Sequence, residues 1–178
     1  MTRFQKSLGV LSLGLALAVP AIVTAHDYES DGRKPSAVLD AGNGQAITFT
    51  WSALHWRQEI FDQIAGNERM RNMMNTQRLN ALVTIKSPVA LQFGEGKVAA
   101  GDQKAGFFVD EKGSWFFVVA GADGKPAAKA PLTLNKSGET YDHLELVTLP
   151  GATKNAGVLK IRYGTYAASV DFTYGAAG

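Results

Sequence analysis

The stretch Val158-Leu159-Lys160-Ile161-Arg162-Tyr163 alternates between apolar and charged residues over most of its length. Successive side chains of a strand point to opposite faces, so this pattern predicts a strand with one face in a core and the other in water. Residues 166–174 repeat the alternation. The intervening Gly164-Thr165 indicates a tight turn, so we expect the two stretches to pair as a C-terminal hairpin.

Short runs of the same kind recur upstream, separated by Gly, Pro, Asn and Asp. The expected strands cover residues 47–51, 81–85, 89–93, 105–109, 115–120, 131–134 and 143–149. Turn signals at intervals of roughly 8–12 residues are typical of sandwiches and barrels. The sequence therefore predicts a mainly β protein, with a single antiparallel β-sandwich domain over residues 46–178.

The periodicity changes between residues 52 and 75, where a short helical flap is expected. Apolar residues recur there at helical spacing: Trp56, Ile60, Phe61 and Ile64. Ser52 is the expected N-cap and Gly66 the expected end, and a second helical segment is expected over residues 67–75. Residues 115–119 are apolar on both faces, so the flap should cover the face that turns away from the core. We expect contacts between the flap and Phe107, Trp115 or Phe117.

The N-terminal segment has the pattern of a cleaved signal peptide over residues 1–25. Arg3 and Lys6 precede an apolar run over residues 8–19, and Val23-Thr24-Ala25 places small or apolar residues at a cleavage site. The run is too short for a spanning helix, and no cysteine follows it to carry a lipid. We therefore expect export to the periplasm or the extracellular space, with no membrane anchor after cleavage. Residues 26–45 are polar and glycine-rich, and we expect an extended N-terminal arm there.

Charge argues against a nucleic-acid partner. The chain has 18 basic and 16 acidic residues, and Arg3 and Lys6 leave with the signal peptide, so 16 of each remain. Nucleic-acid-binding proteins usually carry a clustered basic surplus, and none is visible in this sequence. The chain has no cysteine, so an exported form must be stabilised by packing rather than by disulfides.

No pattern of catalytic residues stands out in the sequence. Gly94-Glu95-Gly96-Lys97 lacks the features of a phosphate-binding loop and indicates a turn. Asp142-His143 with Ser137 or Ser169 has the residue types of a hydrolase triad, but no nucleophile motif accompanies them. We therefore expect no catalytic and no cofactor-binding residues, while a hydrolase of unrecognised type stays an alternative.

Copper binding is a second alternative, based on His26. Cleavage after Ala25 would make His26 the N-terminus, with an α-amino nitrogen and an imidazole in one residue. Together with one more imidazole, these donors suit the planar geometry of Cu(II). His55 or His143 would supply that nitrogen, and His143 is the preferred candidate because its face of the strand is polar. This arrangement is similar to the histidine brace of secreted copper oxygenases.

Three stretches together resemble a family of secreted bacterial proteins known only as a domain of unknown function. They are Ile47–Ser52 followed by Trp56–Phe61, then Lys97–Gly101 followed by Ala105–Phe108 and Gly113–Trp115, and finally Val158–Gly164. In the first stretch, Trp56-Arg57-Gln58-Glu59-Ile60-Phe61 is similar to the family's Gly-Arg-x-Ile-Phe-Gly motif. The family's Trp-Arg-x-Gly-Ala-Asn-Glu signature has no counterpart here. The resemblance implies a compact β-sandwich and no particular activity.

The sequence thus favours an exported, non-catalytic binding module over a copper protein or copper oxygenase. Its partner would be a glycan, a lipid, a small molecule or a protein of the cell envelope or secretome. A row of exposed Trp or Tyr on one sheet face would indicate a sugar. An apolar cavity under the flap would indicate a lipid or another small molecule.

Overall fold

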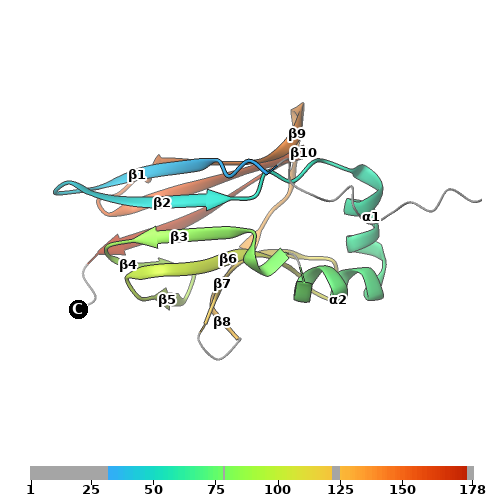
Figure 1. The fold of residues 1–178 in the computed structure, drawn as a ribbon, viewed down its shortest axis with the longest axis horizontal. Helices are drawn as coiled ribbons and strands as arrows, with labels where there is room; N and C mark the ends of the chain where they lie inside the picture. Colours follow the sequence, from blue (N-terminus) through green and yellow to red (C-terminus); the bar gives the residue numbers. More distant parts are fainter. Residues whose placement is uncertain (1–31, 78, 122–124, 176–178) are drawn as a thin grey trace, which may run out of the picture.

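Ten strands form two antiparallel sheets in the computed structural model, which describes residues 32–77, 79–121 and 125–175 (Figure 1). The six-stranded sheet has the order β1 (Ser36–Gly42), β2 (Gln45–Trp51), β3 (Val83–Ser87), β6 (Gly101–Val109), β7 (Trp115–Ala120) and β8 (Pro126–Leu132). The four-stranded sheet has the order β5 (Gly96–Val98), β4 (Ala90–Phe93), β10 (Ala156–Gly175) and β9 (Asn135–Pro150). The predicted mainly β antiparallel sandwich is confirmed.

The core between the sheets is centred on four phenylalanines. Phe49 and Phe117 come from the six-stranded sheet, and Phe93 and Phe172 come from the four-stranded sheet. Ring centroids lie 5.3 Å apart for both Phe93–Phe117 and Phe93–Phe172, and 5.7 Å apart for Phe49–Phe172. All four rings are buried, because the alternating strands place every second side chain on the inner face.

The predicted C-terminal hairpin is wrong, because residues 156–175 form the single long strand β10. Gly164 has a positive φ of 59°, and the pairing of β10 with β9 is irregular on both sides of it. The glycine therefore makes a bulge rather than a turn, and a bulge increases the local twist of a strand. Beyond it, Phe172–Gly175 pairs with β4, so one strand serves two neighbours.

The range predicted to be an extended arm, residues 26–45, contains the edge strand β1. This strand pairs with β2 through a turn at Asn43 and Gly44, whose φ angles are 54° and 73°. An Asn-Gly pair with positive φ at both residues is the preferred connection of a tight hairpin. The buried Leu39 anchors β1 to the core. The predicted signal peptide and His26 lie outside the described residues.

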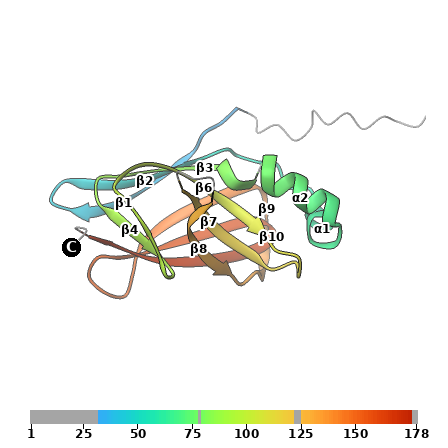
Figure 2. The ribbon, with the colours of Figure 1, turned by 90° about the horizontal axis from the view of Figure 1, so that it is seen from below.

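Two helices close one end of the sandwich (Figures 1 and 2). α1 (Gln58–Gly66) ends at Gly66 as predicted, but it begins after Arg57 and not after Ser52. α2 (Glu68–Gln77) matches the second predicted helical segment, and the Asn67 side chain caps it by accepting a hydrogen bond from the Met70 N–H (3.0 Å). The short 3₁₀ helix η2 (Leu79–Ala81) leads back into β3. No helix in the described ranges has the length and apolarity needed to cross a bilayer.

The flap contacts β7 as predicted, but on the other face of that strand. The rings of Phe61 and Trp115 stack at 4.9 Å with an interplanar angle of 7°. Trp115 pairs with the core residues Val109 and Leu132 and so belongs to the inner face. The helices therefore fill the open end between the sheets rather than covering the outside of one sheet.

The outward-facing aromatic side chains of β6 and β7 are covered by a lysine instead. Lys129 Nζ lies 3.8 Å from the ring centre of Phe116 and 4.8 Å from that of Phe108. A lysine can lay its methylene chain over apolar surface while its ammonium group stays in water. This explains how a strand that is apolar on both faces is accommodated without a second layer of helix.

Candidate functional site

A cavity of about 70 Å³ lies at the helical end of the sandwich, between α1, α2 and the inner faces of both sheets. Its walls are almost entirely apolar, and Arg57 is the one charged residue among the described residues that line it. The helices contribute Ile60, Phe61, Ile64 and Met74, and the sheets contribute Phe107, Trp115, Leu132, Leu144 and Ile161. An apolar cavity offers water few hydrogen-bond partners, so this space favours hydrocarbon over solvent.

An aromatic cluster forms the wall of the cavity on the side of α1. Phe61 lies between two rings, stacked on Trp115 at 4.9 Å and on Tyr166 at 4.8 Å. Trp56 meets Tyr163 edge to face, with ring centroids 4.8 Å apart and an interplanar angle of 87°. Both arrangements are favourable for aromatic pairs, and they hold the first turn of α1 against β10 and β7.

The bulge in β10 makes room for Trp56. A side chain at Gly164 would overlap the indole ring of Trp56, so only glycine fits at this position. The Tyr163 hydroxyl donates to the carbonyl oxygen of His55 (2.7 Å), and the backbone N–H of Trp56 donates to the carbonyl oxygen of Asp142 (2.7 Å). The segment that enters α1 is therefore fixed from both β9 and β10.

The two helices are attached to the body in different ways. The Asn75 side chain of α2 donates to the Val109 carbonyl (2.8 Å) and accepts from the Val109 N–H (2.9 Å). These two bonds satisfy the backbone N–H and carbonyl groups of Val109, which lies beyond the part of β6 that pairs with β3. α1 carries Phe61 and Ile64 into the apolar cluster instead. Apolar contacts are less directional than hydrogen bonds, so α1 is the more easily displaced wall of the cavity.

The histidines lie at the outer edge of this end of the molecule. His143 on β9 faces His55, which precedes α1, in an isolated antiparallel bridge. Their Nε2 atoms are 3.2 Å apart, and Arg33 Nη2 lies 3.3 Å from His143 Nε2. The sequence alone predicts either His55 or His143 as one metal ligand, whereas the structure places the two side by side. His26, the other predicted ligand, lies outside the described residues.

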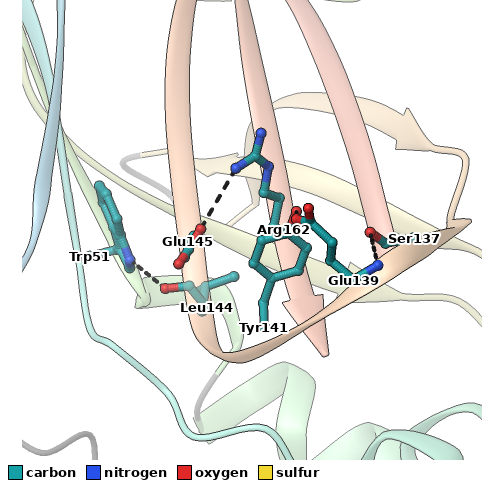
Figure 3. A network of polar contacts seen from close by, with 7 residues as sticks. All are labelled: Trp51, Ser137, Glu139, Tyr141, Leu144, Glu145 and Arg162. Carbon is teal, nitrogen blue, oxygen red and sulfur yellow. Dashed lines mark hydrogen bonds and ion pairs between the residues drawn. The ribbon is translucent and has the colours of Figure 1, made fainter. Parts of the chain in front are cut away.

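The outward face of β9 and β10 carries a set of local polar contacts (Figure 3). Arg162 and Glu145 form an ion pair at 3.9 Å, with 36% and 48% of their side chains exposed. Ser137, a candidate nucleophile, accepts a hydrogen bond from the Glu139 N–H (3.1 Å). A hydrogen bond from the Tyr141 hydroxyl to Glu139 (2.7 Å) raises the pKa of Tyr141 above its ordinary value. The ion pair joins facing residues of β10 and β9, and the other two contacts join neighbours along β9.

One contact in the same view ties this face to the core. The indole N–H of Trp51 donates to the Leu144 carbonyl (2.8 Å) in a buried position, which joins β2 to β9 across the two sheets (Figure 3). Tryptophan usually satisfies its N–H when buried, and here it does so on the strand that carries His143.

Sequence reasoning missed the part that β10 plays in the cavity. The sequence predicts a turn at Gly164-Thr165 between two strands, although aromatic residues stand on both sides of this glycine, at Tyr163 and Tyr166. Aromatic side chains flanking a glycine within a strand are also the pattern of a bulge that receives a ring from another element.

No family model, no curated protein and no solved structure matches the chain. The resemblance to secreted bacterial proteins of unknown function therefore stays a prediction, and the site is argued from its geometry alone.

Proposed function

We propose that this protein is an exported, non-catalytic binding module that takes a small apolar ligand, or the hydrocarbon end of a lipid, into the cavity under α1 and α2. The observation that carries the proposal is the apolar cavity itself, enclosed between the helical flap and both sheets. Ligand sites are usually apolar concavities with a small number of polar groups at the edge, and Arg57, Tyr163 and Tyr166 supply such groups here.

The size of the cavity restricts what it can hold. A dry cavity of about 150 Å³ accommodates benzene, so a space of about 70 Å³ takes a shorter fragment. The closed form therefore fits the terminal carbons of a chain or a small apolar group. A larger ligand requires an outward displacement of α1, which rests on stacked rings rather than on hydrogen bonds to the sheets.

The aromatic side chains favour this ligand over a glycan. Trp115, Tyr163 and Tyr166 line the cavity, Trp56 packs against Tyr163, and all four are half-buried. Within the described ranges no Trp or Tyr is fully exposed, so there is no flat row of rings on which a sugar could stack. The balanced charge of the chain after residue 25 further argues against a nucleic acid or an anionic membrane surface as the partner.

Chain-length-dependent binding tests the proposal. Octanoate, decanoate and dodecanoate are titrated into the chain beginning at His26, and tryptophan fluorescence is recorded, because Trp115 lines the cavity and Trp56 packs against Phe61, which also lines it. We expect saturable binding that becomes tighter as the hydrocarbon lengthens, since each buried methylene contributes about 0.8 kcal/mol.

A pair of matched variants locates the ligand. Leu134→Phe fills space at the cavity wall, whereas Leu149→Phe makes the same change at an exposed position of β9. Leu134→Phe should weaken dodecanoate binding about tenfold or more, and Leu149→Phe should leave it unchanged. Equal affinities in both variants, with both folded by circular dichroism, would place the ligand elsewhere.

A further inference from the structure

The geometry points to a binding site for a divalent transition metal between His55 and His143, separate from the apolar cavity. The two residues face one another across an antiparallel bridge, and their Nε2 atoms are 3.2 Å apart. With metal–nitrogen bonds of about 2.0–2.1 Å, two ligands at about 90–109° around one ion have nitrogens roughly 2.9–3.4 Å apart. The observed separation lies within that range. The ring centroids are 4.0 Å apart with an interplanar angle of 44°, so one ion binds both imidazoles once the two rings rotate to turn their Nε2 lone pairs toward a common point, while the backbone stays in place.

Hydrogen bonds on both sides of the pair hold the backbone of His55 next to that of His143. The backbone N–H of Leu144 donates to the Leu54 carbonyl (2.9 Å), and the backbone N–H of Trp56 donates to the Asp142 carbonyl (2.7 Å). These bonds flank the pair on both sides. The Tyr163 hydroxyl adds a third bond to the His55 carbonyl (2.7 Å). The backbone of the site is therefore pre-organised, and an ion has to order only the rotamers of the two imidazoles and not the two segments that carry them.

Arg33 contacts the same nitrogen of His143 that a metal ion would use. A guanidinium group has only hydrogen-bond donors, so His143 Nε2 accepts from Arg33 Nη2 (3.3 Å) through its lone pair. The same lone pair cannot accept a second full hydrogen bond from His55 Nε2, which lies 3.2 Å away. Metal binding uses both Nε2 lone pairs, so in the metal-bound form each ring carries its proton on Nδ1, and the guanidinium group moves away.

The donor set selects the class of metal. Neutral imidazole nitrogens suit Cu(II), Zn(II) and Ni(II) rather than Mg²⁺ or Ca²⁺, and Cu(II) is expected to bind most tightly. In the described ranges no third His, Asp or Glu joins the pair closely enough to form a larger ligand group. The remaining coordination positions are therefore open to water.

Copper titration of four chains tests this site. The chain beginning at His26 is compared with its His55→Gln, His143→Gln and His26→Gln variants, with the fold of each checked by circular dichroism without metal. We expect one Cu(II) per chain with micromolar or tighter affinity, at least tenfold weaker binding in His55→Gln and in His143→Gln, and an electron paramagnetic resonance signal with at least two coordinated nitrogens. His26→Gln should keep the binding that depends on His55 and His143.

An extra residue ahead of His26 separates this site from an N-terminal chelate. If the extra residue or His26→Gln abolishes binding while His55→Gln and His143→Gln bind like the wild type, the proposal is overturned. Zn(II) provides a second arm, because it should also depend on both histidines of the pair.

Arg33 provides the most specific control for the position of the ion. Its positive charge next to the pair opposes a cation, so Arg33→Gln should tighten Cu(II) binding about threefold to tenfold at low salt. Unchanged or weaker binding in this variant would contradict an ion placed between the two Nε2 atoms.

Discussion

The two aromatic clusters of this protein differ in packing and, we infer, in purpose. At the centre of the sandwich, Phe49, Phe93, Phe117 and Phe172 are buried and come from both sheets. At the helical end, Phe61 packs among the half-buried rings of Trp56, Trp115, Tyr163 and Tyr166, next to a cavity. The comparison indicates that the first cluster holds the sheets together, whereas the second is a closure that leaves room for a ligand.

Truncation in the central cluster should have the largest effect on stability. Phe93→Ala removes a fully buried ring that contacts both Phe117 and Phe172, and we expect a loss of about 3–5 kcal/mol in the free energy of unfolding. Phe61→Ala should cost only about 2 kcal/mol, because α1 can settle into the existing cavity. Urea unfolding at constant m-value measures both. Equal losses would show that the two clusters contribute equally to the free energy of unfolding.

The fit between β10 and the helical end should have the next largest effect. Gly164→Ala places a methyl group into the indole ring of Trp56 at a position with positive φ, and we expect a loss of about 2–4 kcal/mol. Trp56→Ala leaves space for that methyl group. The double variant should therefore lose less than the sum of the two single losses, which a double-mutant cycle measures. Additive losses would mean that the glycine is required by its backbone conformation alone.

The same contrast explains how much of the fold could be predicted from the sequence. Alternation and turn residues predicted the sandwich, because strands such as β2, β3 and β8 obey the period of two, although β7 does not. β10 was divided at Gly164 because a glycine beside a threonine has the composition of a turn. The reason for the bulge is Trp56, more than a hundred residues away in the sequence.

The candidate sites were predictable to a smaller extent. The flap and its contact with Trp115 followed from helical spacing, but the covered face did not, because the sequence does not reveal that Lys129 shields Phe116 and Phe108. His55 and His143 were both visible as candidate ligands. Their proximity depends on an isolated bridge between a loop and β9, which has no local sequence signal.

The smallest expected effect concerns the turn between β6 and β7, next to the end of α1. Asp110 Oδ1 accepts hydrogen bonds from the N–H groups of Lys112 (2.9 Å) and Ser114 (2.8 Å). The bond from Ser114 is the main cause that holds the pKa of Asp110 below its ordinary value. A carboxyl group whose pKa is lower in the folded state stabilises the fold above its unfolded pKa, and that contribution is lost as the pH falls through the folded value.

Asp110→Asn keeps the acceptor oxygen but removes the charge, so it should slightly lower the urea midpoint at pH 6. The difference from the wild type should shrink as the pH is lowered from about 5 to about 3, across the ordinary range of an aspartate. A difference that stays constant over this interval would show that the charge of Asp110 does not contribute to the stability of the turn.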